Sequence, residues 1–338
     1  MNGKRWAALG IAAGLFIFSI FTSFASWALF SSDEDLNAFD DFFSMAGAGF
    51  VEEVIEEGDS LNKIAVLDVE GVITDSSNAT SLFGTVGYNH RAFMNKLEMV
   101  KEDDTVAGVV IRVNSPGGGV VESAEIYDKI QELKKETDKP VYVSMGATAA
   151  SGGYYISAPA DKIYANPETM TGSLGVIMQG INYEKLAEKV GIETVTIKSG
   201  PYKDIMSGTR EMTAEERKIM QNMIDSSYNE FVRIIAEGRG MSEVEVRKIA
   251  DGRIYNGRQA KEIGLIDDFG YLEDVTDAMK KEIKDEDALV VRYTDETGFG
   301  SLFSMTSQKL LGDKLDLSSI MKVVSQPNSP RLMYLYAE

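Results

Sequence analysis

The chain has 338 residues and a formal net charge of −19, with 53 acidic and 34 basic side chains. This length is sufficient for one or two domains with a large core. The strong negative charge argues against nucleic acid as a partner. The chain has no cysteine and one histidine, which excludes disulfides and thiol nucleophiles and leaves no ligand set for zinc. We therefore expect neither a metal nor a cofactor.

The N-terminus predicts a membrane anchor. Residues 6–30 form a run of 25 residues without a charge, and Lys4 and Arg5 precede it. A helix of this length exceeds the roughly 30 Å hydrocarbon core. The basic pair predicts a cytoplasmic segment at residues 1–5 and an extracellular remainder. A cleaved signal peptide is the alternative, but Ser26-Trp27-Ala28 is a poor cleavage site, so we predict an uncleaved, single-pass anchor in the cell membrane.

An acidic segment follows the predicted anchor. Residues 31–61 contain ten acidic side chains and neither lysine nor arginine. Anionic headgroups would repel such a segment, which would hold the folded part of the chain away from the bilayer. A solvated linker with no other role is the alternative. We predict a juxtamembrane linker over these residues.

Strand and helix patterns alternate in residues 62–290, which predicts one α/β domain with a largely parallel sheet. Apolar and β-branched runs predict strands at 63–73, 105–115, 139–146, 161–168 and 193–200. Helical spacing of apolar residues predicts helices at 121–137 and 213–238. The C-terminal extension, residues 291–338, has weak helical patterns at 301–325 and an apolar tail.

Two small-residue turns each join a predicted strand to a predicted helix. They are "NSPGGGV" at 114–120 and "AASGG" at 149–153. The carboxyl ends of parallel strands meet at one edge of a sheet, so we expect the turns to face each other. Backbone N–H groups of Gly118 and Gly152 would then cradle an oxyanion beside a nucleophilic Ser151. A helix cap is the ordinary role of such a serine, and no Gly-Lys-Ser/Thr follows to make a phosphate loop.

A nucleophilic serine needs a base. The only histidine, His90, is expected to be an exposed first-turn residue after the helix cap Asn89, which argues against a Ser-His-Asp triad. Asp-Thr/Ser-Gly segments of aspartic proteases are absent. Serine–lysine pairs are a known variant, and their lysine needs an apolar site that lowers its pKa from about 10.4 by roughly 2–4 units. Lys198 and Lys203 are the candidates, and the residues alone do not choose between them.

Five segments resemble the signal peptide peptidase A family, in its shorter, single-repeat form from Gram-positive bacteria. They are "NSPGGGV", "AASGGYYIS", "TGSLGVI", "SGPYKD" and "DGRIYNGRQAKEIGLID", and the resemblance covers nearly the whole chain. It implies a ClpP/crotonase-like spiral of ββα units with a serine–lysine dyad. The resemblance makes Ser151 the nucleophile and Lys203, 52 residues later, the general base. It also makes Ser173 the residue that orients the lysine amine, with Gly118 and Gly152 as oxyanion donors.

The resemblance also implies a substrate class and an assembly. Members of the family degrade cleaved signal peptides and other apolar peptides, and they form homo-oligomeric rings whose neighbouring subunits contribute to one another's clefts. Here residues 6–30 would contact membrane lipid. The tail, residues 332–338, is extended and apolar, and we predict that it occupies a cleft and is trimmed there.

Two other classes of protein are considered. One is a crotonase-like acyl-binding protein, for which an extracellular domain has no supply of coenzyme A. The other is a non-enzymatic membrane scaffold in which Ser151 and Lys203 are structural.

Overall fold

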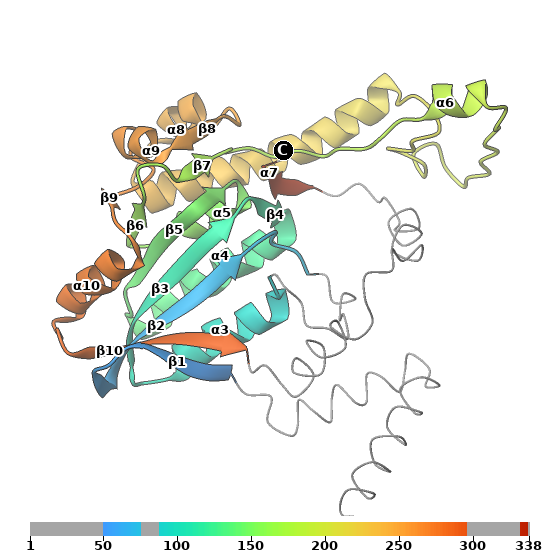
Figure 1. The fold of residues 1–338 in the computed structure, drawn as a ribbon. Coiled ribbons are helices and arrows are strands. Elements are labelled where there is room, and N and C mark those ends of the chain that lie inside the picture. The colour runs from blue at the N-terminus through green and yellow to red at the C-terminus, as the bar shows by residue number, and fades with distance from the viewer. Residues whose placement is uncertain (1–49, 76–87, 296–331, 337–338) are drawn as a thin grey trace, which may run out of the picture. The chain divides into compact units, whose positions relative to one another are not determined.

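The computed structural model describes residues 50–75, 88–295 and 332–336 (Figure 1). From Val51 onward, these residues belong to one compact unit. The predicted anchor and the predicted helices at 301–325 lie outside the described residues. Within the described residues, no helix is long and apolar enough to cross a membrane.

Strands and helices alternate along the chain as the sequence predicts. The strands are β1 (Phe50–Glu56), β2 (Asp59–Glu70), β3 (Val106–Ser115), β4 (Gly117–Gly119), β5 (Val141–Ala150), β6 (Lys162–Ala165), β7 (Met170–Gly172), β8 (Ile254–Asn256), β9 (Asp268–Phe269), β10 (Ala288–Asp295) and β11 (Met333–Leu335). The helices are α3 (His90–Glu102), α4 (Val120–Thr137), α5 (Gly152–Ser157), α6 (Glu184–Lys189), α7 (Ala214–Arg239), α8 (Glu243–Ile249), α9 (Gly257–Glu262) and α10 (Leu272–Ile283).

The described strands form one large sheet and one small one. The large sheet has the order β1-β10-β2-β3-β5-β6-β9, and β7 pairs with β5 and β8 (Figure 1). The pairs from β10 through β2, β3 and β5 to β6 and β9 are parallel, as is the β5–β7 pair. The small sheet is the antiparallel pair of β4 and β11. The predicted α/β class with a mainly parallel sheet is confirmed.

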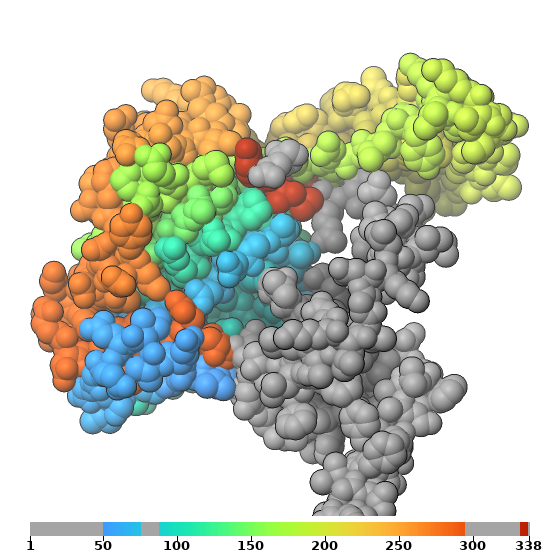
Figure 2. Space-filling model, viewed as in Figure 1, coloured from blue at the N-terminus to red at the C-terminus, as the bar shows by residue number. Residues whose placement is uncertain are grey.

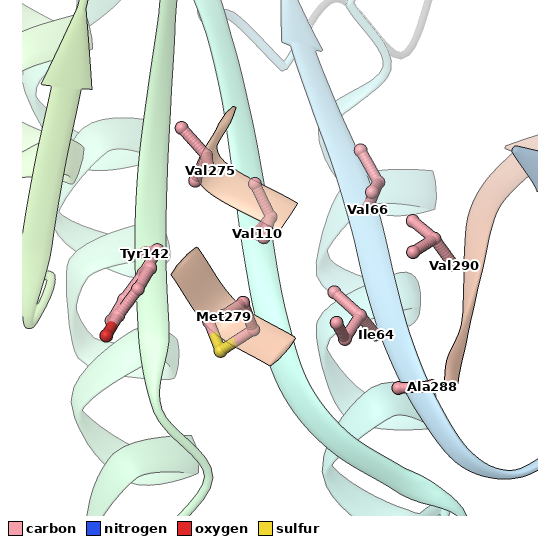
Figure 3. Packing of buried hydrophobic residues seen from close by; sticks show 8 residues of the cluster. All are labelled: Ile64, Val66, Val110, Tyr142, Val275, Met279, Ala288 and Val290. Atoms are coloured by element: carbon pink, nitrogen blue, oxygen red, sulfur yellow. The ribbon is translucent and has the colours of Figure 1, made fainter. Parts of the chain in front are cut away.

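The central strands are buried on both faces, as expected for parallel strands covered by helices. Eight residues form a core cluster between the sheet and α10 (Figure 3): Ile64, Val66, Val110, Tyr142, Val275, Met279, Ala288 and Val290. A Cβ on Gly108 of β3 would stand 2.6 Å from Sδ of Met279. Because Gly108 has no side chain, α10 can pack this closely on the sheet.

Most of the predicted elements are confirmed, and one is wrong. The strands β2, β3, β5 and β6 and the helices α4 and α7 lie where the sequence predicts them. The predicted strand at 193–200 is not a strand, and Ile197 within it is 98% exposed. Its alternating pattern fits a strand, but no described strand pairs with it. β1 lies within residues 31–61, for which the sequence predicts a linker.

The segment before α7 leaves the sheet. Residues 181–211, here called the arm, carry α6 and extend away from the sheet beside the N-terminal end of α7 (Figure 1). α6 has no buried residue. Eight large apolar side chains of the arm are exposed to solvent: Ile181, Tyr183, Leu186, Val190, Ile192, Val195, Ile197 and Tyr202. The arm therefore presents apolar surface that the described part of its own chain does not cover.

The core cluster generates a prediction for stability. Met279→Ala should lower the free energy of unfolding by about 2–5 kcal/mol, because truncation leaves a cavity between α10 and the sheet. Met279 is fully buried, whereas Met223 on α7 is 45% exposed. Met223→Ala is therefore the control and should change the free energy by less than about 0.5 kcal/mol. Chemical denaturation of the full-length chain measures both, and equal effects would contradict this account of the core.

Candidate active site

Ser151 lies between β5 and α5 in a backbone conformation that few residues with a side chain adopt. Its φ is 54° and its ψ is −114°. Such a conformation costs roughly 1–3 kcal/mol and persists only where the surrounding structure holds it. The residue is 1% exposed. Strained, buried residues of this kind concentrate at functional sites.

The surroundings hold Ser151 through its backbone and not through its side chain. Its N–H donates to the carbonyl oxygen of Gly172 at 2.8 Å, and its own carbonyl accepts from the N–H of Tyr155 at 2.9 Å. Ser151 is the N-cap residue of α5, yet its side chain makes no capping hydrogen bond. The ordinary role of a serine at a helix start is therefore not the role of this hydroxyl.

The glycine turn of β4 lies directly beside Ser151. A Cβ on Gly152 would stand 3.0 Å from the nitrogen of Gly118 and 2.8 Å from Oγ of Ser123. A Cβ on Gly117, whose φ is +98°, would stand 2.5 Å from the nitrogen of Gly152. The structure thus brings the backbone nitrogens of Gly118 and Gly152 together, in a space that only glycine leaves open.

Ser173 lies close to Ser151. It directly follows β7, and the last residue of that strand, Gly172, accepts the hydrogen bond from the Ser151 N–H. Ser173 also has a positive φ, 50°, and its N–H donates to the carbonyl oxygen of Arg253 at 2.7 Å. The residue is buried. The parallel pairing of β5 with β7 therefore brings the two predicted serines side by side.

The two candidate lysines lie in the arm. Lys198 donates to Oδ1 of Asp204 at 2.6 Å and to the carbonyl oxygen of Pro201 at 3.1 Å. Lys203 is exposed on the turn that follows. Among the described residues, the Lys203 ammonium has neither a hydrogen bond nor an ion pair. Lys198 is thus paired with a carboxylate, whereas the Lys203 amine has no such partner among the described residues.

The structure does not bring Lys203 to the serine of its own chain. Arg210, seven residues after Lys203, pairs with Glu216 in the first turn of α7. Phe231, fifteen residues further along α7, packs on Tyr155 of α5 with ring centroids 5.1 Å apart. Fifteen residues of helix rise about 22 Å. The arm therefore joins α7 about 22 Å from the point where the helix meets α5.

A strand of the C-terminal tail occupies the cleft in front of β4. In β11, Tyr334 lies opposite Gly118 in an antiparallel pair. On its other side, Met333 exchanges two hydrogen bonds with Ile177, of 3.0 and 3.1 Å. Figure 2 shows this strand, in red, seated beside the start of the arm. The predicted occupation of a cleft by the tail is confirmed for residues 332–336, and its trimming stays a prediction.

The carbonyl oxygen of Tyr334 lies close to the two glycine turns. Its oxygen lies 3.0 Å from the place of a Cβ on Gly152 and 2.0 Å from that of a Cβ on Gly117. The same place near Gly152 lies 3.0 Å from the nitrogen of Gly118. An oxyanion hole places backbone N–H donors around the carbonyl oxygen of a bound peptide, and the positions of these atoms are compatible with one. Strand pairing at a cleft edge is a common way to bind an extended peptide.

The side chain of Tyr334 fills an aromatic pocket. It is 1% exposed, and its ring stacks on Tyr155 with centroids 4.7 Å apart and packs on Phe231 at 4.8 Å. Its hydroxyl donates to the carbonyl oxygen of Ser227 at 3.0 Å. Burial raises the pKa of Tyr334, so the hydroxyl keeps its proton and remains a donor. The pocket suits a large, mainly apolar side chain.

The cleft continues past Tyr334. A cavity of about 580 Å³ is lined by Leu335 and Tyr336 of the tail together with Pro116 and Thr148. The N–H of Tyr336 donates to the carbonyl oxygen of Pro116 at 2.9 Å. The cleft thus accepts chain on both sides of the Tyr334 carbonyl, as cleavage within a peptide requires.

His90 corrects one expectation. The capping role of Asn89 is confirmed, because its Oδ1 accepts from the Ala92 N–H at 3.0 Å. The expected exposure of His90 is wrong, since it is 6% exposed. Its Nδ1 lies 2.7 Å from the Tyr88 hydroxyl and its Nε2 lies 2.6 Å from Glu125. Both ring nitrogens of His90 are thus engaged, by Tyr88 just before α3 and by Glu125 on α4. Within the described ranges, no group of residues is suited to hold a metal ion.

Sequence reasoning missed the aromatic pocket. Tyr155 is visible beside the small-residue turn, but Phe231 looks like an ordinary core residue of an amphipathic helix. Their contact joins residues 76 positions apart. The aromatic residues of the tail were the only signal in the sequence that such a pocket exists.

Comparisons with known proteins show what the chain is similar to. The sequence model of Peptidase family S49 matches residues 133–285, and that of Clp protease matches residues 85–180. An Enterococcus faecium protein assigned as signal peptide peptidase SppA is 42% identical over 99% of both chains. Protease 4 of Haemophilus influenzae is 30% identical over 91% of this chain and 52% of its own. A solved structure of a ClpP1 mutant from Listeria monocytogenes matches with a TM-score of 0.40 and 20% identity, covering 62% of this chain and 92% of its own.

A chloroplastic serine protease, SPPA, of Arabidopsis thaliana is 32% identical over 62% of this chain and 31% of its own. Together, the family model and these sequence relatives define a serine protease. The similarity to the Enterococcus faecium protein extends over 99% of both chains and therefore identifies the family. The chain belongs to peptidase family S49.

The glycine turn generates a prediction for activity. Gly117→Ala should lower kcat/KM by at least about 100-fold, because the new methyl group occupies the place of the substrate carbonyl beside the oxyanion donors. Hydrolysis of a fluorogenic apolar peptide by the full-length chain in mild detergent measures this effect.

Gly240→Ala is the matched control for that variant. Gly240 also has a positive φ, 63°, but a Cβ there meets nothing within 4 Å. Both variants carry the strain of a side chain at positive φ, and only Gly117→Ala fills the cleft. Equal losses of activity would show that backbone strain, and not the filled space, is responsible.

Proposed function

We propose that the chain is a serine endopeptidase with Ser151 as nucleophile and the N–H groups of Gly118 and Gly152 as oxyanion donors. The observation that carries this proposal is the position of the Tyr334 carbonyl, next to both glycine nitrogens and within an extended strand. Binding through backbone pairing favours a peptide over an acyl thioester. No cofactor is needed for this chemistry.

In this mechanism, neutral Lys203 takes the proton of the Ser151 hydroxyl as the oxygen attacks the peptide carbonyl carbon. The carbonyl electron pair moves to its oxygen, where the two glycine N–H groups stabilise the charge. The carbon–nitrogen bond then breaks, and Lys203 returns the proton to the leaving amine. Water attacks the resulting ester and frees Ser151. Ser173 hydrogen-bonds the lysine amine and orients it for both proton transfers.

Lys203 serves the serine of a neighbouring copy in a homo-oligomeric ring. Two observations support this part of the proposal. The arm joins α7 at the helix end distant from α5, and it exposes eight large apolar side chains. Burying such a surface against a second copy is favourable by about 25 cal/mol per Å². The dyad then forms only in the assembly.

The substrates are apolar peptides, including signal peptides released into the membrane. The apolar tail strand and the aromatic pocket around Tyr334 support this class. The name of the Enterococcus faecium relative supports signal peptides in particular. In this proposal residues 6–30 anchor the chain in the cell membrane with the catalytic domain outside, where such peptides leave the bilayer.

The shared dyad predicts complementation. Ser151→Ala and Lys203→Met should each be inactive alone, whereas subunits mixed by refolding or co-expression should regain up to about a quarter of wild-type activity. In a mixed assembly, an intact serine from one variant then meets an intact lysine from the other. Hydrolysis of a fluorogenic apolar peptide measures this recovery. A mixture that forms oligomers and stays inactive would contradict the shared site, and activity in either single variant would contradict the dyad.

The seated tail predicts self-trimming. Active protein should lose residues 335–338, because the Tyr334 carbonyl lies beside the proposed oxyanion donors. Ser151→Ala should keep them, and Tyr334→Asp should slow the trimming by placing a charge in the aromatic pocket. Intact-mass analysis measures where the chain ends in all three proteins. Identical C-termini in the active protein and in Ser151→Ala would contradict this prediction.

A further inference from the structure

A network of charged side chains holds the turn that carries Lys203. Asp204 accepts from Nζ of Lys198 at 2.6 Å, and from Nε and Nη2 of Arg210 at 2.9 and 2.7 Å. Arg210 also donates through Nη1 to Glu216 at 2.9 Å and pairs with it through Nη2. Glu216 lies in the first turn of α7 and is 2% exposed. Arg210 therefore ties the turn to the helix.

The network is ionised and its charges balance. Hydrogen bonds from Arg210, and then from Lys198, hold the pKa of Asp204 well below its usual range. Hydrogen bonds from Arg210 also lower the pKa of Glu216 to about 2. Both carboxylates are therefore charged wherever a lysine could act as a base. The two carboxylates oppose two cations, so the network adds no net charge beside Lys203.

This balance matters because a general base must be neutral to accept a proton. Asp204 directly follows Lys203, and consecutive Cα atoms lie about 3.8 Å apart. At physiological ionic strength, charges interact over a Debye length of about 8 Å. An unpaired Asp204 carboxylate would favour the protonated, inactive form of the Lys203 amine. The sequence thus places a carboxylate where it would oppose catalysis unless cations neutralise it.

We propose that Arg210 and Lys198 are positioning residues for Lys203, which neutralise Asp204 so that the amine is free of its proton at lower pH. This inference rests on the proposed function of Lys203 as the general base. The charged groups that face Asp204 are Lys198 and Arg210 of the arm, and Glu216 of α7 faces Arg210. Lys185 and Glu211 form a separate pair on the exposed surface of the arm.

The test is the pH dependence of kcat/KM for a fluorogenic apolar peptide, with full-length protein in mild detergent. In Arg210→Gln, the pH of half-maximal kcat/KM should rise by about one unit, because Asp204 loses its main partner. Asp204→Asn leaves two cations without their carboxylate, so its midpoint should move in the opposite direction. The double variant should return close to the wild-type midpoint. Shifts of opposite sign do not arise from loss of folding.

Two further variants complete the design. Lys198→Met leaves Glu216 and the start of α7 untouched, and it should raise the midpoint even if Arg210→Gln folds poorly. Arg233→Gln is the matched control, because Arg233 also bridges two carboxylates, those of Glu230 and Glu237 on α7. Its midpoint should equal that of the wild type. All shifts should shrink at about 1 M salt, where the Debye length falls to about 3 Å.

The outcomes separate this inference from the proposed function. Lower activity at every pH with unmoved midpoints in Arg210→Gln and Lys198→Met would overturn the inference, because the network would then only support the fold. If Lys203→Met is inactive in the same assay, the proposed role of Lys203 as general base is not contradicted by that result. Activity that persists in Lys203→Met would instead overturn the proposed base, and this inference with it.

Discussion

The close approach of two backbone turns, at Gly118 and Gly152, is the constraint on which the rest of the site depends. Parallel pairing of β3 with β5 places Ser115 opposite Ala149, so both strands end at the same edge of the sheet. A Cβ at Gly118 would stand 1.8 Å from the carbonyl oxygen of Ile73, and one at Gly152 would stand 2.8 Å from Oγ of Ser123. This crowding leaves two backbone nitrogens facing one small space. It also gives the tail strand an edge, β4, on which to pair.

The two halves of the proposed dyad differ in how they are held. The serine half stands on a core of buried parallel strands, which can hold the roughly 1–3 kcal/mol of strain at Ser151. The lysine half lies on an arm whose helix α6 has no buried residue, and the Arg210–Glu216 ion pair joins this arm to α7. A rigid nucleophile and a base supplied by another copy would restrict cleavage to the assembled protein.

Much of the fold and part of the site could be predicted from the sequence, for identifiable physical reasons. Buried parallel strands such as 105–115 have continuous β-branched runs, and glycine turns are visible because few other residues can take their place. The strand predicted at 193–200 was wrong because alternating apolar and polar residues fit one face of a sheet, but a strand also needs a neighbouring strand to pair with. His90 was placed wrongly because its partner Glu125, 35 residues away, reaches it only through the packing of α3 on α4. The aromatic pocket and the Arg210 network depend in the same way on contacts that local pattern does not contain.

The central claim is that Ser151 is the nucleophile, and covalent labelling tests it most directly. The full-length protein would be treated with a fluorophosphonate and the adduct located by peptide mapping, with Ser151→Ala in parallel. The account predicts a single adduct on Ser151, formed faster as the pH rises, and no adduct in the variant. An adduct on another residue, or no reaction in folded and assembled wild-type protein, would contradict it.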